Sequence, residues 1–282
     1  MIVVTGATGQ LGRLVIASLL KTTPAAHIVA AVRDVAKAAD LAAQGVQVRR
    51  ADYNDAASLD AAFAGATKVL LISSNELGQR VPQHHAVIDA AVRVGAGLFV
   101  YTSVLHADSS ALSLAAEHRE TEALIRASGL AYSLLRNGWY VENYTAGLGG
   151  ALAHGALAGA AGEGRIAAAA RADYADAAAA VLSSKGPVEQ VYELAGDTAF
   201  TLAELAAEVS RQSGKQVPFH NLPQKDYQDM LLGLGLPAPL AELIADSDAA
   251  AAKGALDDDG RALSKLIGRP TITLADAVKA AL

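Results

Sequence analysis

The first twelve residues place the strongest constraint on the fold of this chain. An apolar run, Ile2-Val3-Val4, leads directly into Thr5-Gly-Ala-Thr-Gly-Gln-Leu-Gly12, and an amphipathic helical pattern continues through Leu19. Glycine permits a tight turn at position 6, a close approach of backbone to a pyrophosphate at position 9, and close packing of the helix at position 12. The free N–H groups that open such a helix attract phosphate. We therefore predict a strand, a glycine turn and a helix that together bind a dinucleotide.

Length and composition exclude several classes of function. A chain of 282 residues is long enough for one large or two modest domains. It has no cysteine, which excludes disulfides, a cysteine nucleophile, thiolate zinc sites and iron–sulfur clusters. The formal net charge of −6 is spread over interspersed charges of both signs. Such a mixture of charges offers no continuous basic surface to a nucleic-acid backbone, so we expect no nucleic-acid partner.

One uncharged segment, residues 143–162, needs testing as a membrane span. It contains Gly155-Ala-Leu-Ala-Gly159, which matches the GxxxG pattern of membrane helix dimers. It also contains Asn143, Tyr144, His154 and six glycines, and is therefore too polar and too interrupted to span a bilayer. We predict a short helix, a turn and a strand here. Because no signal peptide is recognisable, we expect a cytoplasmic protein.

Strands and helices alternate along the first half of the chain. Apolar runs predict strands at 28–32, 46–50, 68–72, 98–102 and 131–135, and helical patterns fall at 35–44, 56–63, 83–94 and 117–127. This alternation predicts an α/β fold with a doubly wound parallel sheet. We expect residues 1–144 to form an NADP-binding Rossmann domain to which segments around 170–196 return, and residues 145–282 to form a smaller substrate-side α/β domain.

The second half has a different rhythm. Gly/Ala-rich segments lead to a predicted strand at 191–194 and a helix at 202–212, which Thr201 could cap together with Glu204. We interpret the alanine runs at 167–170 and 177–180 as composition rather than as disorder.

Polar groups follow the predicted strands at their carboxyl ends. In open α/β sheets, ligands bind beyond these ends. One crevice should therefore be lined by Gly6 to Gly9, Arg33, Asp52, Ser73 to Asn75, Thr102 to His106 and Arg136 to Glu142.

Arg33 indicates which nucleotide binds. Sites built for NAD usually carry Asp or Glu at the end of the second strand, where the carboxylate bonds the ribose 2′-hydroxyl. Here that position is Arg33. A guanidinium suits a 2′-phosphate, and charge-assisted hydrogen bonds of about 1.5–3 kcal/mol predict a roughly ten- to hundredfold preference for NADPH over NADH. The alternative is an ordinary surface ion pair of Arg33 with Asp34 or Asp52.

The usual proton donor of short-chain reductases is absent. These enzymes carry a Tyr-xxx-Lys pair on a helix, and none of the eight tyrosines here is followed by lysine four residues later. The nearest match, Tyr132 with Arg136, lies on a predicted strand. When the helix is aligned on Glu122, the tyrosine and lysine positions fall at Leu114 and His118.

Seven segments carry a family resemblance: Thr5-Gly-Ala-Thr-Gly-Gln-Leu-Gly12, Leu71-Ile-Ser-Ser74, Tyr101-Thr-Ser103, Leu105-His-Ala-Asp108, Leu134-Leu-Arg-Asn-Gly-Trp-Tyr140, Glu142-Asn143 and Tyr192-Glu-Leu-Ala-Gly-Asp197. Over nearly its whole length the chain resembles the NmrA-like, atypical short-chain dehydrogenase/reductases, and within them the bacterial type-2 NAD(P)H:quinone oxidoreductases. Triphenylmethane-dye reductases are similar over the same segments.

The resemblance also implies a set of cofactor-binding residues. It implies that the nicotinamide of NADPH faces a pocket between the two domains. The residues that it implies for NADPH are Gly6, Ala7, Thr8, Gly9, Gln10, Leu11, Arg33, Ser73, Ser74, Asn75, Asn137, Gly138, Trp139, Tyr140, Val141 and Glu142.

Candidate substrate residues come from the aromatic cluster and one loop histidine. Trp139, Tyr140 and Tyr144 follow a predicted strand, where aromatic faces could hold a nicotinamide or a quinone, or could only pack between domains. His106 could donate a proton, although a lone loop histidine is more often merely solvated. We take Tyr140, Tyr144 and His106 as candidates and assign no catalytic residue.

Three functions are compatible with these observations. A quinone that accepts hydride becomes a stabilised phenolate, so its reduction needs no positioned acid, unlike reduction of a ketone. We therefore predict an NADPH-dependent quinone oxidoreductase that transfers hydride directly, without flavin or metal. The alternatives are a reductase of triphenylmethane dyes or other conjugated acceptors, and a non-catalytic NADP(H)-binding redox sensor. The physiological acceptor and the oligomeric state stay open.

Overall fold

The computed structural model describes residues 1–76 and 78–282. The strands are β1 (Ile2–Thr5), β2 (Ile28–Val32), β3 (Gln47–Arg50), β4 (Lys68–Leu71), β5 (Leu98–Val104), β6 (Tyr132–Asn137), β7 (Leu157–Gly159), β8 (Val191–Leu194) and β9 (Phe219–Asn221). The α-helices are α1 (Gln10–Leu19), α2 (Ala39–Ala43), α3 (Ala56–Phe63), α4 (Arg80–Arg93), α5 (Ala115–Ala127), α6 (Glu142–Thr145), α7 (Leu148–His154), α8 (Arg171–Ser183), α9 (Leu202–Ser213), α10 (Gln224–Gly233), α11 (Ala238–Ala251), α12 (Ala262–Ile267) and α13 (Leu274–Ala281). Two short 3₁₀ helices, η1 (Ala25–His27) and η2 (Val35–Ala38), precede β2 and α2.

The chain divides into two compact units. The first contains residues 1–104, 117–137 and 171–193, and the second contains residues 105–116, 138–170 and 194–282. The chain therefore leaves the first unit and returns to it twice. The expected assignment of one part to the nucleotide and the other to the substrate stays a prediction.

A seven-stranded sheet organises the first unit, in the order β3-β2-β1-β4-β5-β6-β8. The pairs from β3 through β6 are parallel, with Ile2 opposite Ile28 and Val69 opposite Phe99. Chain order reverses between β1 and β4, and such a switch point is where doubly wound sheets bind ligands. The predicted α/β fold with a parallel sheet is confirmed.

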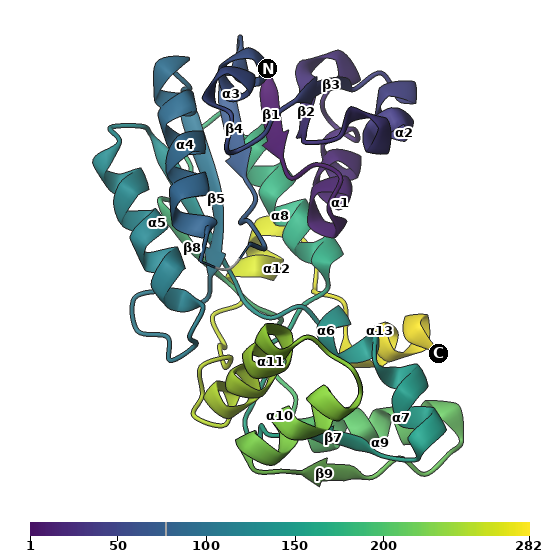
Figure 1. Ribbon diagram of the computed structural model, residues 1–282. Helices are drawn as coiled ribbons and strands as arrows, with labels where there is room; N and C mark the ends of the chain where they lie inside the picture. The colour runs from purple at the N-terminus through teal and green to yellow at the C-terminus, as the bar shows by residue number, and fades with distance from the viewer. Residues whose placement is uncertain (77) are drawn as a thin grey trace. The chain divides into compact units, whose positions relative to one another are not determined.

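Helices cover both faces of this sheet (Figure 1). Alternate strand residues such as Val3, Val69 and Phe99 join Phe63 of α3 and Val87 of α4 in one buried cluster. The helices α1 and α8 pack against each other and do not contribute to that cluster, so they cover the opposite face. Burial on both faces explains the apolar runs 2–4, 28–32 and 98–101 within β1, β2 and β5.

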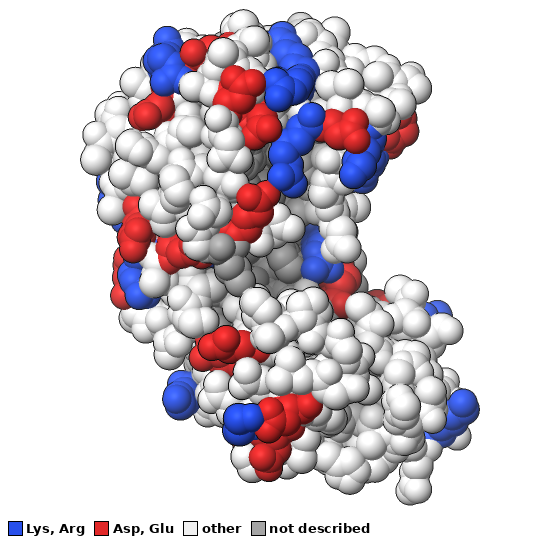
Figure 2. All heavy atoms as spheres, viewed as in Figure 1, with Lys and Arg blue, Asp and Glu red and all other residues white. Residues whose placement is uncertain are grey.

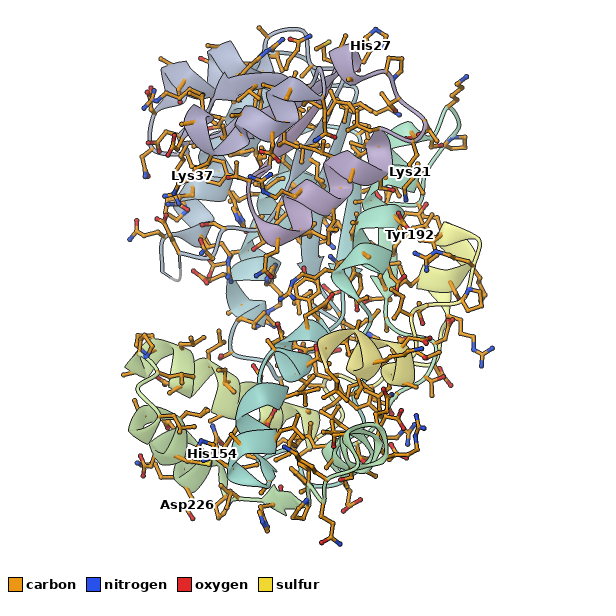
Figure 3. All side chains as sticks on the ribbon, turned by 90° about the vertical axis from the view of Figure 1, so that its right-hand side faces the viewer. Lys21, His27, Lys37, His154, Tyr192 and Asp226 are labelled. Carbon is orange, nitrogen blue, oxygen red and sulfur yellow. The ribbon has the colours of Figure 1, made fainter. Side chains whose placement is uncertain are left out.

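Polar bonds fix α1 to α8. Ser18 Oγ donates to Asp176 Oδ1 at 2.6 Å, and Lys21 Nζ lies 3.3 Å from the same oxygen. Figure 3 shows Lys21 just beyond the end of α1. Ser18 and Asp176 are 158 positions apart in the sequence, so their hydrogen bond fixes α1, the helix that follows the glycine turn, to the distant helix α8.

The second unit contains a small parallel sheet, β7 with β9, and the helices around it. Helix α9 begins with a complete capping box, in which Thr201 Oγ1 accepts from the Glu204 N–H and Glu204 accepts from the Thr201 N–H. The predicted cap is confirmed. Over 143–162 the structure has two short helices, α6 and α7, rather than the one predicted, and the predicted strand follows as β7.

One sequence prediction about local structure was wrong. Residues 35–44 form η2 followed by the short α2 rather than one helix, because the Asp34 carboxylate accepts the Ala36 N–H at 3.0 Å and favours a tight turn. The alanine run 177–180 lies inside α8 and is ordered, as expected, and its small side chains let the helix pack closely against α1. The helix itself was not predicted, because most of its residues are buried and no amphipathic period marks it.

Charged side chains are mixed over the surface. On the face shown in Figure 2, basic and acidic side chains lie next to each other, without a continuous basic area. No helix in the described part of the chain is long and apolar enough to cross a membrane.

Candidate nucleotide-binding site

The glycine turn between β1 and α1 has the geometry that the sequence predicts. Gly6 has a φ of +60°, a conformation that favours glycine, and the Gly9 N–H donates to the Gly6 carbonyl at 2.9 Å. Gly9 is the N-cap of α1 and provides no side-chain cap. The first N–H groups of α1 therefore remain available to an anion.

Gly12 is required by the turn itself. A Cβ at this position would lie 2.3 Å from the Gly6 carbonyl oxygen and 2.8 Å from the Ala7 Cα. Both are backbone atoms that cannot move without opening the turn. The reason for glycine at position 12 is therefore contact with the turn rather than contact with the sheet.

We expect Gly12→Ala to lower the free energy of unfolding by about 1–3 kcal/mol and to weaken dinucleotide binding, because the turn must open to admit the methyl group. Urea unfolding and a nucleotide titration measure the two effects. Gly150→Ala is the matched control: position 150 lies in α7 with nothing within 4 Å of the added Cβ, so stability should stay unchanged or rise slightly. Equal losses in the two variants would contradict this account.

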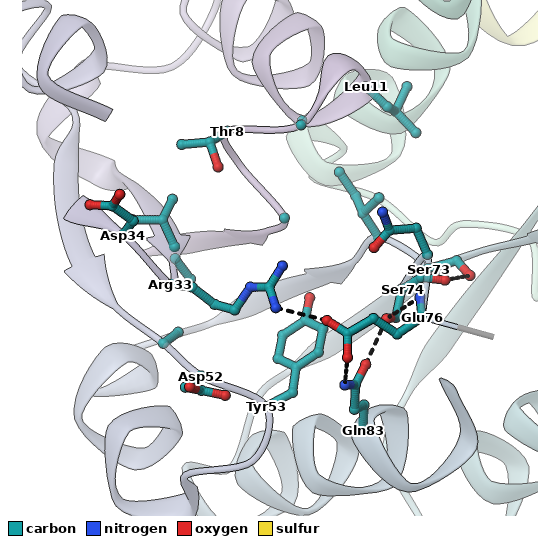
Figure 4. Close-up of a pocket in the computed structure, with 18 of the residues that line it drawn as sticks. Thr8, Leu11, Arg33, Asp34, Asp52, Tyr53, Ser73, Ser74, Glu76 and Gln83 are labelled. Carbon is teal, nitrogen blue, oxygen red and sulfur yellow. Dashed lines mark hydrogen bonds and ion pairs between the residues drawn. The ribbon is translucent and has the colours of Figure 1, made fainter. Parts of the chain in front are cut away.

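A pocket of about 830 Å³ opens at the carboxyl ends of β1, β2, β3 and β4 (Figure 4). Of the residues predicted from the sequence, it is lined by Gly6, Thr8, Gly9, Gln10, Leu11, Arg33, Ser73, Ser74 and Asn75, and Asp52 also lines it. Ala7 is fully buried and does not line the pocket. The switch point of the sheet therefore brings together segments from four separate places in the sequence.

Arg33 forms an ion pair across this pocket. Its Nη1 lies 2.7 Å from Glu76 Oε1, and the two side chains are 68% and 38% exposed. Neither Asp34 nor Asp52, the partners considered from the sequence, holds this bond: the Asp34 carboxylate accepts from Ala36 N, and Asp52 accepts from Asn54 N. The guanidinium faces the pocket while paired to a carboxylate of the segment that follows β4 (Figure 4).

The segment after β4 is held by backbone bonds at Ser74. The Ser74 N–H donates to His84 Nε2 at 2.9 Å, and Arg80 Nε donates to the Ser74 carbonyl at 2.8 Å. Because Nε2 accepts, Nδ1 carries the proton and donates to Thr121 Oγ1 at 2.9 Å. Ser73 N–H also donates to Thr102 Oγ1 of β5. Three elements, α4, α5 and β5, therefore position a segment that lines the pocket.

Two buried histidines beside this segment are neutral. Burial, followed by the charge of Arg80, lowers the pKa of His84 to about 3. Burial likewise lowers the pKa of His118 to about 3, with Arg80 and His84 adding to the effect. His118 Nδ1 lies 2.7 Å from the Tyr101 hydroxyl, whose pKa burial raises. His118, at the position aligned with the reductase lysine, is therefore uncharged near pH 7.

The remaining predicted cofactor residues follow β6. The Gly138 N–H donates to Leu194 O, and the Ala169 N–H donates to Trp139 O. Tyr140 forms an isolated parallel bridge with Ala169, and the Val141 N–H donates to Ala169 O at 3.0 Å. Glu142 begins α6. Residues 139–141 are thus held by Ala169 and Gly138 by Leu194, and their part in cofactor binding stays a prediction.

Two buried polar atoms near these residues have no hydrogen-bond partner in the described structure: Asn137 Oδ1 at the end of β6 and the Tyr144 hydroxyl. Tyr144 packs edge-on against Phe200. Burial raises the pKa of Tyr144 well above its usual value, and the charges of Asp248 and Tyr227 add to this effect. Its hydroxyl therefore keeps its proton.

His106 lies in the second unit. Its φ is +52°, and its Nε2 lies 3.3 Å from Asp258 Oδ2. A carboxylate partner fixes the ring, which the sequence did not indicate because 152 positions separate the two residues. Its suggested role as a substrate residue stays a prediction.

Sequence reasoning missed several residues of the pocket, among them Glu76, Gln83, Tyr53, Lys37 and Arg13. Glu76 had one usable signal, its position shortly after β4, which ends at the crevice, whereas Gln83 lies inside α4. Tyr53 directly follows Asp52, and burial raises its pKa to about 12. Among the described residues, no group of three or more His, Asp or Glu side chains could hold a metal ion.

Comparisons with known proteins place this geometry among dinucleotide-dependent reductases. The model of the NmrA-like family matches residues 1–269. Quinone oxidoreductase 2 of Escherichia coli (strain K12) is 59% identical over 278 residues, which cover 99% of this chain and 97% of that protein.

Solved structures agree over the whole chain. The NADPH complex of the NADPH-dependent quinone oxidoreductase QOR2 from Escherichia coli aligns with a TM-score of 0.98 and 58% identity, covering 99% of each chain. The triphenylmethane reductase of Citrobacter sp., complexed with NADP(H), aligns with a TM-score of 0.97 and 40% identity, covering 100% of each chain.

Proposed function

The chain belongs to the NmrA-like family, and we propose that it is an NADPH-dependent quinone oxidoreductase. The observation that carries this function is the 59% identity to Escherichia coli quinone oxidoreductase 2, which extends over 99% of the chain. A cytoplasmic location, expected from the sequence, stays a prediction.

The pocket fits a dinucleotide phosphate. Gly6 adopts the positive φ that the turn requires, Gly12 lets α1 pack against that turn, and α1 presents uncapped N–H groups to a pyrophosphate. Arg33 stands at the end of β2, where such folds meet the adenosine ribose. The N–H groups of α1 thus suit the pyrophosphate and the Arg33 guanidinium suits the 2′-phosphate, the two phosphate sites that NADPH requires.

The protein contributes positioning to the reaction. Bound NADPH supplies a hydride, so that NADPH, a quinone and one proton from water give NADP⁺ and a hydroquinone. Ser73, Ser74 and Asn75 line the pocket on a segment fixed by Arg80 and His84, which keeps one wall of the site rigid. Such preorganisation lowers the entropy cost of bringing two rings together.

His118, which stands where short-chain reductases carry their lysine, is compatible with a hydride acceptor whose reduction needs no strong acid. His118 is 5% exposed, neutral, and bonded to Tyr101. It therefore differs from a charged lysine that would lower the pKa of a catalytic tyrosine. A quinone product is a phenolate that is already stabilised, so water can supply its proton.

An anaerobic single-turnover experiment tests this function. Mixing the NADPH-loaded protein with a soluble benzoquinone should consume one NADPH for each hydroquinone formed, because hydride transfer moves two electrons at once. Without quinone, NADPH should bind and persist. A stoichiometric flavin in the purified protein, or semiquinone as the main product, would contradict direct transfer.

The same assay separates the alternatives. The likeness to triphenylmethane reductase at 40% identity makes dye reduction the second candidate. Faster decolourisation of a triphenylmethane dye than reduction of any quinone would favour it. Tight binding of NADPH with no turnover of either acceptor would favour a redox sensor.

A further inference from the structure

The pocket contains the carboxylate of Glu76 beside Arg33, where a site that binds only NADPH would not be expected to place a negative charge. Glu76 Oε1 lies 2.7 Å from Arg33 Nη1, and both residues line the pocket. Arg33 is the cation at the end of β2 that the proposed function pairs with the ribose phosphate. In the protein alone, that cation is therefore already neutralised by a group of the chain.

Glu76 is held in this position by a closed set of hydrogen bonds. Its Oε2 accepts from Gln83 Nε2 at 2.7 Å, and its own N–H donates to Ser74 Oγ at 3.2 Å. Ser74 Oγ in turn donates to Gln83 Oε1 at 2.6 Å, which fixes the orientation of the Gln83 amide. Gln83 is only 4% exposed. The carboxylate is thus fixed by a buried side chain of α4, unlike a mobile surface group (Figure 4).

A fixed carboxylate acts oppositely on the two nicotinamide cofactors. A 2′-phosphate must compete with Glu76 for the Arg33 guanidinium, and two anions beside one cation repel each other. A 2′-hydroxyl can instead donate to the carboxylate, which is the bond that NAD sites make with an Asp or Glu. In those sites the acid follows the second strand, whereas Glu76 follows β4.

We propose that Glu76 is a specificity-determining residue that opposes Arg33: it accepts the ribose 2′-hydroxyl of NADH and weakens binding of the NADPH 2′-phosphate. This inference rests on the proposed function of the pocket. It predicts that the protein accepts both cofactors, with a preference for NADPH that is smaller than Arg33 alone would give. Arg33 and Glu76 together set the ratio.

Binding titrations of the Glu76→Gln variant test the proposal without any turnover. Adenosine 2′,5′-bisphosphate should bind more tightly and NADH more weakly than in the wild type, which should raise the NADPH-to-NADH affinity ratio by about five- to twentyfold. Wild-type protein should also bind NADH more tightly than 2′-deoxy-NADH, and the variant should not. The amide preserves the side-chain shape and the acceptor for Gln83.

Asp60→Asn is the matched control, because it also removes one exposed carboxylate that pairs with an arginine at 2.7 Å, here Arg93, away from the pocket. It should leave the affinity ratio unchanged. If NADPH binding and quinone turnover persist but the NADPH-to-NADH affinity ratio of Glu76→Gln stays within about twofold of the wild-type ratio, the proposal is overturned. If the wild type binds no adenosine 2′,5′-bisphosphate, the proposed function itself fails.

Discussion

Replacing Arg33 with aspartate is expected to weaken NADPH binding by about ten- to hundredfold and to remove the preference for NADPH, since charge-assisted hydrogen bonds to a phosphate contribute about 1.5–3 kcal/mol. The new carboxylate would stand at the end of β2, where NAD sites carry an acid. NADH binding should therefore stay within a few fold of the wild type. Fluorescence titration of both cofactors measures the two dissociation constants directly.

Arg93→Asp provides a stringent comparison for this variant. Arg93 is also an exposed arginine, 45% exposed, whose guanidinium lies 2.7 Å from a carboxylate, and it does not line the pocket. The two substitutions make the same change of charge and break equivalent ion pairs. If Arg33→Asp leaves the cofactor preference unchanged, or if Arg93→Asp changes it equally, Arg33 does not recognise the 2′-phosphate.

Acidification should destabilise the protein through its two buried histidines. Histidine titrates near 6.5 when unfolded, whereas burial holds the pKa of His84 and His118 at about 3. Between these values the unfolded chain binds protons that the folded protein does not. Stability is therefore complete above pH 6.5 and is lost as the pH falls, by about 1.4 kcal/mol per pH unit for each histidine.

One buried acid opposes this trend. Burial raises the pKa of Asp248 to about 6, so this group favours the folded state at low pH and destabilises it as the pH rises through the interval from 3.8 to 6. Its effect on the pH dependence of the free energy of unfolding cancels that of about one of the two histidines. The net slope of stability against pH should nevertheless remain positive between pH 4 and 6, with about 1.4 kcal/mol per unit remaining.

His118→Asn isolates the histidine contribution. An asparagine amide can occupy the position of Nδ1 and keep the bond to Tyr101 while it removes the titration. Urea unfolding at several pH values should show a slope smaller by about 1.4 kcal/mol per pH unit than in the wild type. The same substitution at His27, which lies exposed before β2 (Figure 3), is the control.

An independent measurement needs no variant. The imidazole of His118 in the wild-type protein can be titrated by NMR. A pKa near 6.5 for this ring, or equal changes of slope in the His118 and His27 variants, would show that burial does not keep it neutral.

Local patterns predicted most of the first unit. The strands at 28–32, 68–72 and 98–102 were placed within two residues of β2, β4 and β5, because strands buried on both faces are largely apolar. The strand at 191–194 also matches β8. Helix α8 was missed because most of its residues are buried, so that its sequence has no amphipathic period to detect. The helices of the second unit after α9, which are α10 to α13, were also not anticipated.

Sequence alone determined the glycine turn, the order of the strands from β1 to β6, and the presence of Arg33 at the end of β2, because each depends on residues adjacent in the chain. Only the tertiary structure decided what those residues face. Glu76 reaches Arg33 from 43 positions away, and His84 and His118 become neutral because β5, α4 and α5 exclude water around them. Charge partners and burial are properties of three-dimensional packing, and no local pattern encodes them.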